Sequence, residues 1–253
     1  MRLLMLLSLT LPLGSPAAAQ ERIARVGQLM WSDRGAHHDA TRRAFLDPVK
    51  TEFVKSMARP GTRATGVTTM TAELTGKRMQ MLVQAVPGLQ RIGVPIDEVI
   101  RDTCKQEVDA MDEAARRLGV SLIYFQVKEL EDVEPAIRKL ADDRAQALLI
   151  TFTSARHSLE QTIASAALKY RMAVMSQFRS DAPLGSLMSY GPDLDEVYRR
   201  AGQYAGRILK GEKPSKMPVQ EPSKLHLAVN LKTARALRLT LPPGVILADE
   251  VVE

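Results

Sequence analysis

Several hydrophobic segments of the sequence are followed at once by side chains that can contact a small molecule. These segments are predicted β-strands, and ligands of an open parallel sheet bind beyond the carboxyl ends of its strands. The pattern therefore predicts a binding site for a small solute at one edge of a sheet. The candidate residues are Trp31 and Ser32 after the first strand, and Asp97, Thr153, Ser154, Phe178 and Arg179 after later strands.

Motifs for covalent chemistry are absent from the sequence. No GxSxG, HExxH or GxGxxG segment occurs. Gly76 and Lys77 are followed by Arg78, and no glycine lies five residues before Gly76, so this segment is not a phosphate-binding loop. We therefore predict no catalytic residues and no enzymatic activity. The remaining nucleophile, base and carboxylate candidates are too generic to define a triad, and they are Ser176, His157 and Asp181.

Metal ligands are similarly sparse. His37 and His38 are adjacent, so their side chains point apart on a regular backbone, and no cysteine or carboxylate cluster completes a ligand set. Cys104 is the single cysteine, which excludes an internal disulfide, and its spacing predicts a small buried residue on a helix. We predict no metal and no cofactor.

The composition is that of an ordinary globular protein. The chain has 253 residues, of which 45% are hydrophobic and 25% are charged. The formal net charge of +6 is spread along the chain rather than gathered in a basic block or a basic helix with interleaved aromatic residues. The pattern favours a solvated basic surface over nucleic-acid binding.

The first residues have the pattern of a secretory signal peptide. Arg2 precedes an apolar run over 3–13, and the small residues at 17–19 form a cleavage site, so residues 1–19 are predicted to be removed after Ala19. The apolar run is too short to span a bilayer, and no cysteine stands at the cleavage site to carry a lipid. We predict an exported protein that does not span the membrane.

From residue 72 onwards, predicted helices and strands alternate regularly. This order predicts βαβ units, a parallel sheet and right-handed crossovers. A further predicted helix spans 193–210. The predicted helices of the alternating part are 72–86, 100–118, 132–143 and 158–171, and its strands are 91–95, 120–127, 146–152 and 173–178.

Before residue 72 the sequence predicts few secondary-structure elements. A predicted strand over 24–30 is followed by a short helix that starts at Ala40 and is stopped by Asp47 and Pro48. One strand and one short helix are too little for an open sheet with both faces covered.

An ordered series of motifs carries a resemblance to a known family. The series includes "SMARPGTRATG", "ELTGKRMQMLVQAVPGL", "MSYGPDLDEVYRRA", "RILKGEKPSKMPVQEP" and "VNLKTARALRL". In this order the motifs resemble periplasmic substrate-binding proteins of ABC transporters, of the aromatic-amino-acid type. The resemblance implies an α/β bilobal fold of the type I periplasmic-binding-protein kind, with a Rossmann-like parallel sheet and helices on both faces in each lobe.

The resemblance also implies that this chain lacks part of its N-terminal lobe. The family has several βα units before its "DPV" segment, whereas here Asp47 follows the first short helix directly. We predict a shortened N-terminal lobe from residues 20–90 and 191–215. The C-terminal lobe would comprise residues 91–190 and 216–253, and Tyr190 would lie at a hinge crossing.

A small organic solute, such as an amino acid, is the ligand that the resemblance implies. Its carboxylate would pair with Arg179, Arg156, or hydroxyl and helix N-terminal N–H groups, and its ammonium group with Asp97 or Asp47. Trp31 and Phe178 are the candidate apolar walls. The solute would be carried in the periplasm to an ABC permease by hinge closure. The alternative is a shortened paralogue or interaction protein that no longer binds or transports a ligand.

Overall fold

The structure is a computed structural model that describes residues 54–96, 105–127, 129–151 and 159–253. The predicted signal peptide and the predicted strand over 24–30 lie outside these ranges. The strands are β1 (Arg91–Pro95), β2 (Ser121–Phe125), β3 (Ala147–Leu149), β4 (Ala173–Ser176), β5 (Met188–Pro192), β6 (Leu225–Asn230) and β7 (Glu250–Val252). The α-helices are α2 (Thr71–Ala85), α4 (Lys105–Leu118), α5 (Val133–Asp142), α6 (Glu160–Lys169), α7 (Leu194–Leu209), α8 (Leu231–Leu237) and α9 (Pro243–Ile246). Short 3₁₀ turns are η1 (Leu130–Asp132), η3 (Arg179–Asp181) and η4 (Pro214–Lys216).

The strands form one seven-stranded sheet in the order β2-β1-β3-β4-β5-β6-β7. Strands β1 to β5 are parallel, as the alternating pattern predicted. Strand β6 runs antiparallel to β5, so the sheet is mixed rather than wholly parallel. The reason is the path of the chain: β5 leaves the sheet into α7, and β6 enters the sheet from the same edge. The short strand β7 then pairs with β6 in parallel.

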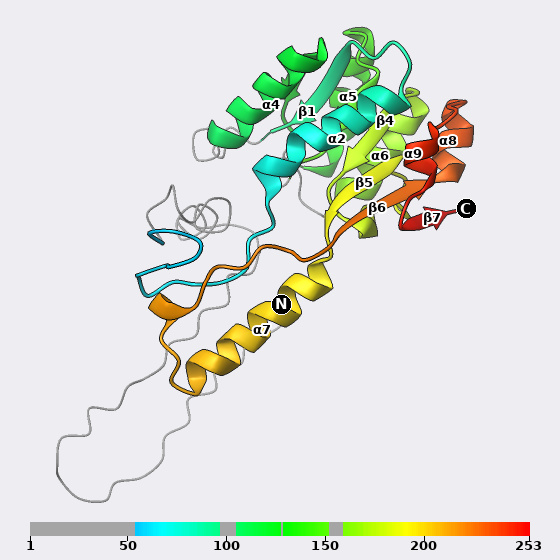
Figure 1. Cartoon of the computed structure of the whole chain (residues 1–253). Coiled ribbons are helices and arrows are strands. Elements are labelled where there is room, and N and C mark those ends of the chain that lie inside the picture. Colours follow the sequence, from blue (N-terminus) through cyan, green and yellow to red (C-terminus); the bar gives the residue numbers. More distant parts are fainter. Residues whose placement is uncertain (1–53, 97–104, 128, 152–158) are drawn as a thin grey trace, which may run out of the picture.

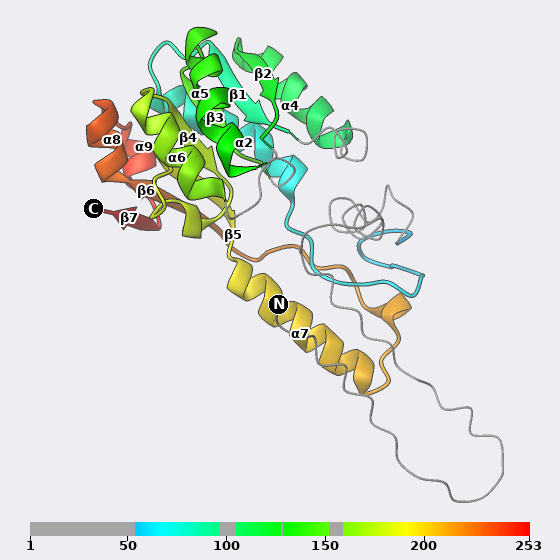
Figure 2. The same ribbon diagram turned by 180° about the vertical axis from the view of Figure 1, so that it is seen from behind.

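Helices cover both faces of the sheet, as expected for a Rossmann-like arrangement (Figures 1 and 2). Helices α2 and α4 pack on one face, and α5 and α6 pack together on the other. Strand β3 shows the alternation that makes this possible, because Ala147 and Leu149 belong to the first core while Leu148 belongs to the second. A strand buried on both faces reads as a continuous apolar run, which explains the sequence "ALLI".

Helix α2 belongs to this sheet, although the predicted boundary at residue 90 assigned it to the N-terminal lobe. Met79, Leu82 and Ala85 lie in one core with Ile92 of β1 and Met111 of α4. Their spacing of three to four residues forms a stripe along α2, and that stripe requires an apolar partner. The division of the chain into two lobes itself stays a prediction.

Helix α7 extends away from the sheet beside two other segments (Figure 1). Its Tyr204 is buried, and the hydroxyl of Tyr204 donates to the carbonyl of Pro218 at 2.8 Å. An isolated parallel bridge joins Val67 to Gln220, and the hydroxyl of Thr65 donates to the carbonyl of Met217 at 2.7 Å. Segments far apart in the sequence therefore meet along α7. Within the described ranges, no helix is both long and apolar enough to cross a membrane.

A substitution at Gly93 in β1 tests how tightly the core against the sheet is packed. A Cβ atom at Gly93 would lie 2.7 Å from Leu148 Cδ2 and 2.8 Å from Leu140 Cδ1. We expect Gly93→Ala to lower the free energy of unfolding by about 1–3 kcal/mol, because an extra methyl group overpacks the core. Gly202→Ala is the matched control, since nothing lies within 4 Å of its Cβ position on exposed α7. We expect this control to raise stability by up to about 1 kcal/mol in urea unfolding. A stable Gly93→Ala variant would contradict the packing.

Candidate functional site

The carboxyl ends of β1, β3, β4 and β5 lie at one edge of the sheet, because these strands are parallel. Strand β2 lies on one side of β1 and β3 lies on the other. The chain leaves β1 through α4 towards β2 and leaves β3 through α6 towards β4, so the connections from these two adjacent strands run in opposite directions. The point between β1 and β3 is therefore the topological switch point at which ligands of such sheets bind. Ile96 and Thr151, both buried, are the last described residues on its two sides.

Six of the predicted ligand-binding residues lie outside the described residues. Two groups follow the switch point directly in the sequence, namely Asp97 after β1 and Thr153 with Ser154 after β3. The others precede the first described residue. These are Trp31, Ser32 and Asp47. Their contact with a ligand stays a prediction.

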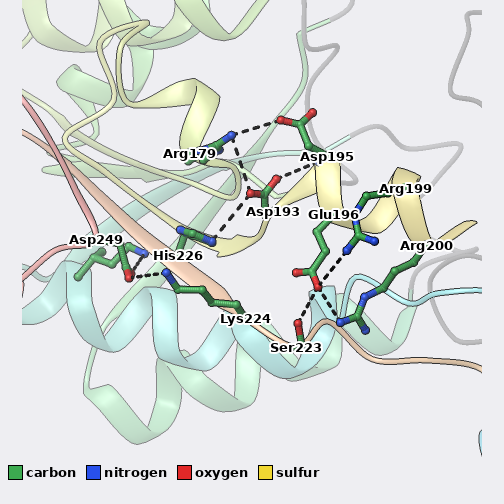
Figure 3. Close-up of polar contacts among 11 residues, drawn as sticks. Arg179, Asp193, Asp195, Glu196, Arg199, Arg200, Ser223, Lys224, His226 and Asp249 are labelled. Carbon is green, nitrogen blue, oxygen red and sulfur yellow. Dashed lines mark hydrogen bonds and ion pairs between the residues drawn. The ribbon is translucent and has the colours of Figure 1, made fainter.

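Phe178 and Arg179 are described, and they follow β4 at the same edge. Phe178 is half-buried, and its backbone N–H donates to Asp181 Oδ2 at 3.0 Å. The side chain of Arg179 is 44% exposed and pairs with Asp195 at 3.2 Å and with Asp193 at 3.8 Å (Figure 3). The cation predicted to bind a ligand carboxylate is thus held by two carboxylates at the start of α7.

Tyr190, the predicted hinge residue, lies in β5 shortly before α7 begins. Its carbonyl accepts a hydrogen bond from Nε of Arg78 on α2 at 2.6 Å. Arg78 is completely buried, and burial lowers the pKa of its guanidinium to about 10, an effect that the charge of Glu107 partly offsets. The group therefore stays charged at neutral pH. It anchors α2 to the point at which the chain leaves the sheet.

The backbone of β5 at Gly191 approaches the backbone after β4 closely, which also fixes the end of β5. A Cβ atom at Gly191 would lie 2.2 Å from the carbonyl oxygen of Gln177 and 3.2 Å from a terminal nitrogen of Arg78. Only glycine leaves room for β4 and β5 to run this close. Our sequence analysis did not identify Arg78 as a site residue. Its place on the apolar stripe of α2, four residues after Leu74 and four before Leu82, was the available signal for a buried arginine.

A pair of buried carboxyl groups supports the loop that carries Phe178 and Arg179. Glu160, in the first turn of α6, and Asp181, in η3, are both buried. Burial, with the nearby Asp181 charge and hydrogen bond, raises the pKa of Glu160 to about 10. Glu160 is therefore protonated at neutral pH. Asp181 also accepts hydrogen bonds from the N–H of Phe178 and the hydroxyl of Ser180, each at 3.0 Å.

The start of α7 is also tied to β6 and to the connector that precedes it. Asp193 is the N-cap of α7, accepting the backbone N–H of Asp195 at 2.9 Å, and it lies 3.9 Å from Nε2 of His226 on β6 (Figure 3). In the first turn of α7, Glu196 accepts a hydrogen bond from the hydroxyl of Ser223 in the connector before β6 at 2.7 Å, and it also pairs with Arg200 of the same helix at 2.6 Å. Polar contacts from three directions therefore fix where α7 departs. Among the described residues, no group of three or more histidine, cysteine, aspartate or glutamate side chains could hold a metal ion.

The protonated Glu160 predicts a pH dependence of stability. A carboxyl group with a raised folded-state pKa stabilises the fold below its ordinary pKa of 4.5, and this contribution is lost as the pH rises towards 10. We expect Glu160→Gln to remove this decline, so that the variant gains stability over the wild type progressively between pH 5 and pH 9 in thermal melts, by at most about 1.4 kcal/mol for each pH unit. Glu131→Gln, at an exposed position, should not change the profile. Parallel profiles of wild type and Glu160→Gln would contradict the assignment.

The two roles of Asp193 can be separated by substitution. Asp193→Asn keeps a cap oxygen but removes the charge that faces Arg179 and His226, whereas Asp193→Ala removes both. We expect the asparagine variant to lose less than about 1 kcal/mol and the alanine variant about 0.5–2 kcal/mol of unfolding free energy. Urea denaturation measures both. Equal losses would show that the charge, rather than the cap, stabilises this end of α7.

Comparisons with known proteins show what this chain and its fold are similar to. A tyrosine-binding protein of Clostridioides difficile is 22% identical over 194 residues, which are 77% of this chain and 55% of that protein. The chain thus spans about half the length of this curated relative.

Three solved structures have a similar fold. An ABC domain in complex with L-Trp from Streptococcus pneumoniae has a TM-score of 0.72 at 22% identity, covering 82% of this chain and 69% of that one. A conserved domain protein from Vibrio cholerae gives 0.71 at 23% identity, covering 81% and 68%. The ligand-free, open structure of a substrate binding protein with adhesive properties from Clostridium difficile gives 0.62 at 23% identity, covering 82% and 68%.

The family itself is shown by sequence. Residues 42–252 match the profile of ABC transporter substrate binding proteins, which includes every described element from α2 to β7. The resemblance stated from the motifs is confirmed, and the chain belongs to the family of ABC transporter substrate-binding proteins.

Proposed function

We propose that this protein binds an aromatic amino acid beyond the carboxyl edge of its sheet and delivers it to an ABC permease by hinge closure. The observation that carries the proposal is the layout of that edge. The switch point between β1 and β3, the loop after β4 and the departure of α7 all lie there. In a two-lobe receptor, the strand ends that face the other lobe form one wall of the ligand site.

The ligand class follows from chemistry and from relatives together. Phe178 offers an aromatic surface, and Arg179 offers a cation within reach of the same loop. One relative is called tyrosine-binding, and one structural neighbour was solved with L-Trp. An apolar ring with a charged main chain suits these groups.

Hinge closure gives the carboxylates around Arg179 a role in this function. Arg179 joins the loop after β4 to the first turn of α7, the helix that leaves the sheet. A ligand carboxylate that competes for Arg179 would alter the contact that fixes the direction of α7. Binding at the edge would thereby bias the orientation of the elements beyond it.

The predicted export of the chain agrees with the same proposal. The predicted signal peptide over residues 1–19 would place the mature chain, beginning at Gln20, in the periplasm, where such receptors meet their permeases.

A second candidate is a shortened paralogue that no longer transports a solute. Residues 54–70 contribute one isolated bridge, Val67 with Gln220, rather than a strand of a second sheet. The chain also spans 55% of the tyrosine-binding relative. A receptor with one complete wall would retain the fold of its sheet without closing around a ligand.

Ligand-dependent stability separates the two candidates. The chain from Gln20 should bind L-tryptophan or L-tyrosine in isothermal titration calorimetry. At a hundredfold excess over Kd, binding adds about 2.7 kcal/mol, which raises the melting temperature by roughly 5–10 °C. D-tryptophan, L-lysine and ribose are the controls, and they should shift the melt less. A cooperative melt that no amino acid shifts would contradict the receptor function and favour the shortened paralogue.

A further inference from the structure

Gln177, directly after β4, has a buried amide without a hydrogen-bond partner. The residue is 3% exposed, and neither Nε2 nor Oε1 finds a protein partner in the part of the chain that the structure describes. Buried amides almost always have partners, because desolvation of an unsatisfied donor or acceptor is unfavourable. A native protein that retains such a group has a use for it.

Several polar groups around Gln177 are hydrogen-bonded within the protein, whereas the buried hydroxyl of Ser189 on β5 shares with the Gln177 amide the lack of a partner among the described residues. The hydroxyl groups of Ser176 and Ser186 are hydrogen-bonded to each other at 2.7 Å. The backbone N–H of Phe178 donates to Asp181, and the carbonyl of Tyr190 accepts from Arg78. The Gln177 amide is the larger of the two unpaired groups here, with both its donor nitrogen and its acceptor oxygen unused among the described residues.

Gln177 lies at the carboxyl edge of the sheet. It directly follows β4, which lies between β3 and β5, the strand that leads to α7. Gly191 admits the Gln177 carbonyl at close range, which fixes its backbone against the hinge. The residue therefore stands on the carboxyl edge between the switch point and the hinge.

We propose that the Gln177 amide recognises the main chain of the bound amino acid, with Nε2 donating to its carboxylate and Oε1 accepting from its ammonium group. The inference rests on the proposed function. A zwitterion presents one acceptor and one donor side by side, and an amide presents the complement. A charged side chain would satisfy one of these groups and repel the other. A neutral amide also leaves no buried charge when the site is empty.

Gln177→Met tests the proposal, because methionine has a similar volume and no amide. If the amide is kept for a ligand, its loss should leave the melting temperature of the ligand-free protein unchanged or raise it. The same variant should bind L-tryptophan roughly tenfold to a hundredfold more weakly in calorimetry. Gln84→Met, on the exposed side of α2, is the matched control and should keep wild-type affinity.

Ligand analogues show which group the amide contacts. Tryptamine lacks the carboxylate, and indole-3-propanoate lacks the ammonium group. Each should lose less affinity than L-tryptophan does on passing from wild type to Gln177→Met, because each has already lost one of the two hydrogen bonds.

Three results would overturn the inference in distinguishable ways. If wild type binds L-tryptophan and Gln177→Met retains that affinity, the amide is not a ligand contact while the receptor function stands. A clear fall in the melting temperature of ligand-free Gln177→Met would show that the amide is bonded within the protein. If wild type binds no amino acid, the proposed function fails, and this inference fails with it.

Discussion

The hydrogen bond from the buried guanidinium of Arg78 to the carbonyl of Tyr190 is the interaction around which this protein is arranged. Tyr190 lies in the strand from which the chain leaves the sheet, and Arg78 lies on the helix that opens the βα alternation. A completely buried arginine is unfavourable unless its donors and charge are compensated. Glu107, Tyr190 and Asp181 favour its charged form. The charge therefore holds helix α2, the end of β5 and the loop after β4 in one relative position.

Two further contacts hold the loop after β4, one to α6 and one to α7. At α6, the protonated Glu160 can share a hydrogen bond with Asp181, because two ionised carboxylates would repel each other at a buried site. At α7, Arg179 reaches the first turn of the helix. Contacts within the protein thus hold the loop after β4 in place. A pre-organised site loses less conformational entropy on binding than a mobile one.

Local patterns predicted the elements that alternate regularly, and they failed where the path of the chain decides the structure. The helix predicted over 132–143 is α5 (Val133–Asp142), because Val133, Ile137 and Leu140 recur at helical spacing. The antiparallel direction of β6 depends on where α7 ends, which no local pattern contains. Strand β7 has three residues, which are too few to show a strand period.

The same limit applies to the site. Arg179 was correctly placed after β4, but its pairing with Asp193 and Asp195 depends on the arrival of β5 and α7 from later in the sequence. Arg78 was overlooked as a site residue because a single arginine on an amphipathic helix usually reaches solvent. Gln177 is a common residue type whose significance lies only in what surrounds it. Sequence patterns therefore located the edge of the sheet, and tertiary packing assigned the individual side chains.

The return of the chain at Leu225 has a consequence for how this protein assembles. Pro192 pairs with Leu225, so the whole excursion over 193–224 begins and ends at adjacent points of one sheet. The entropy lost on closing such a loop grows only slowly with its length. The seven-stranded lobe can therefore complete its core while the excursion is still unfolded. We therefore expect the parallel strands to form the folding nucleus and the segment attached to α7 to dock late.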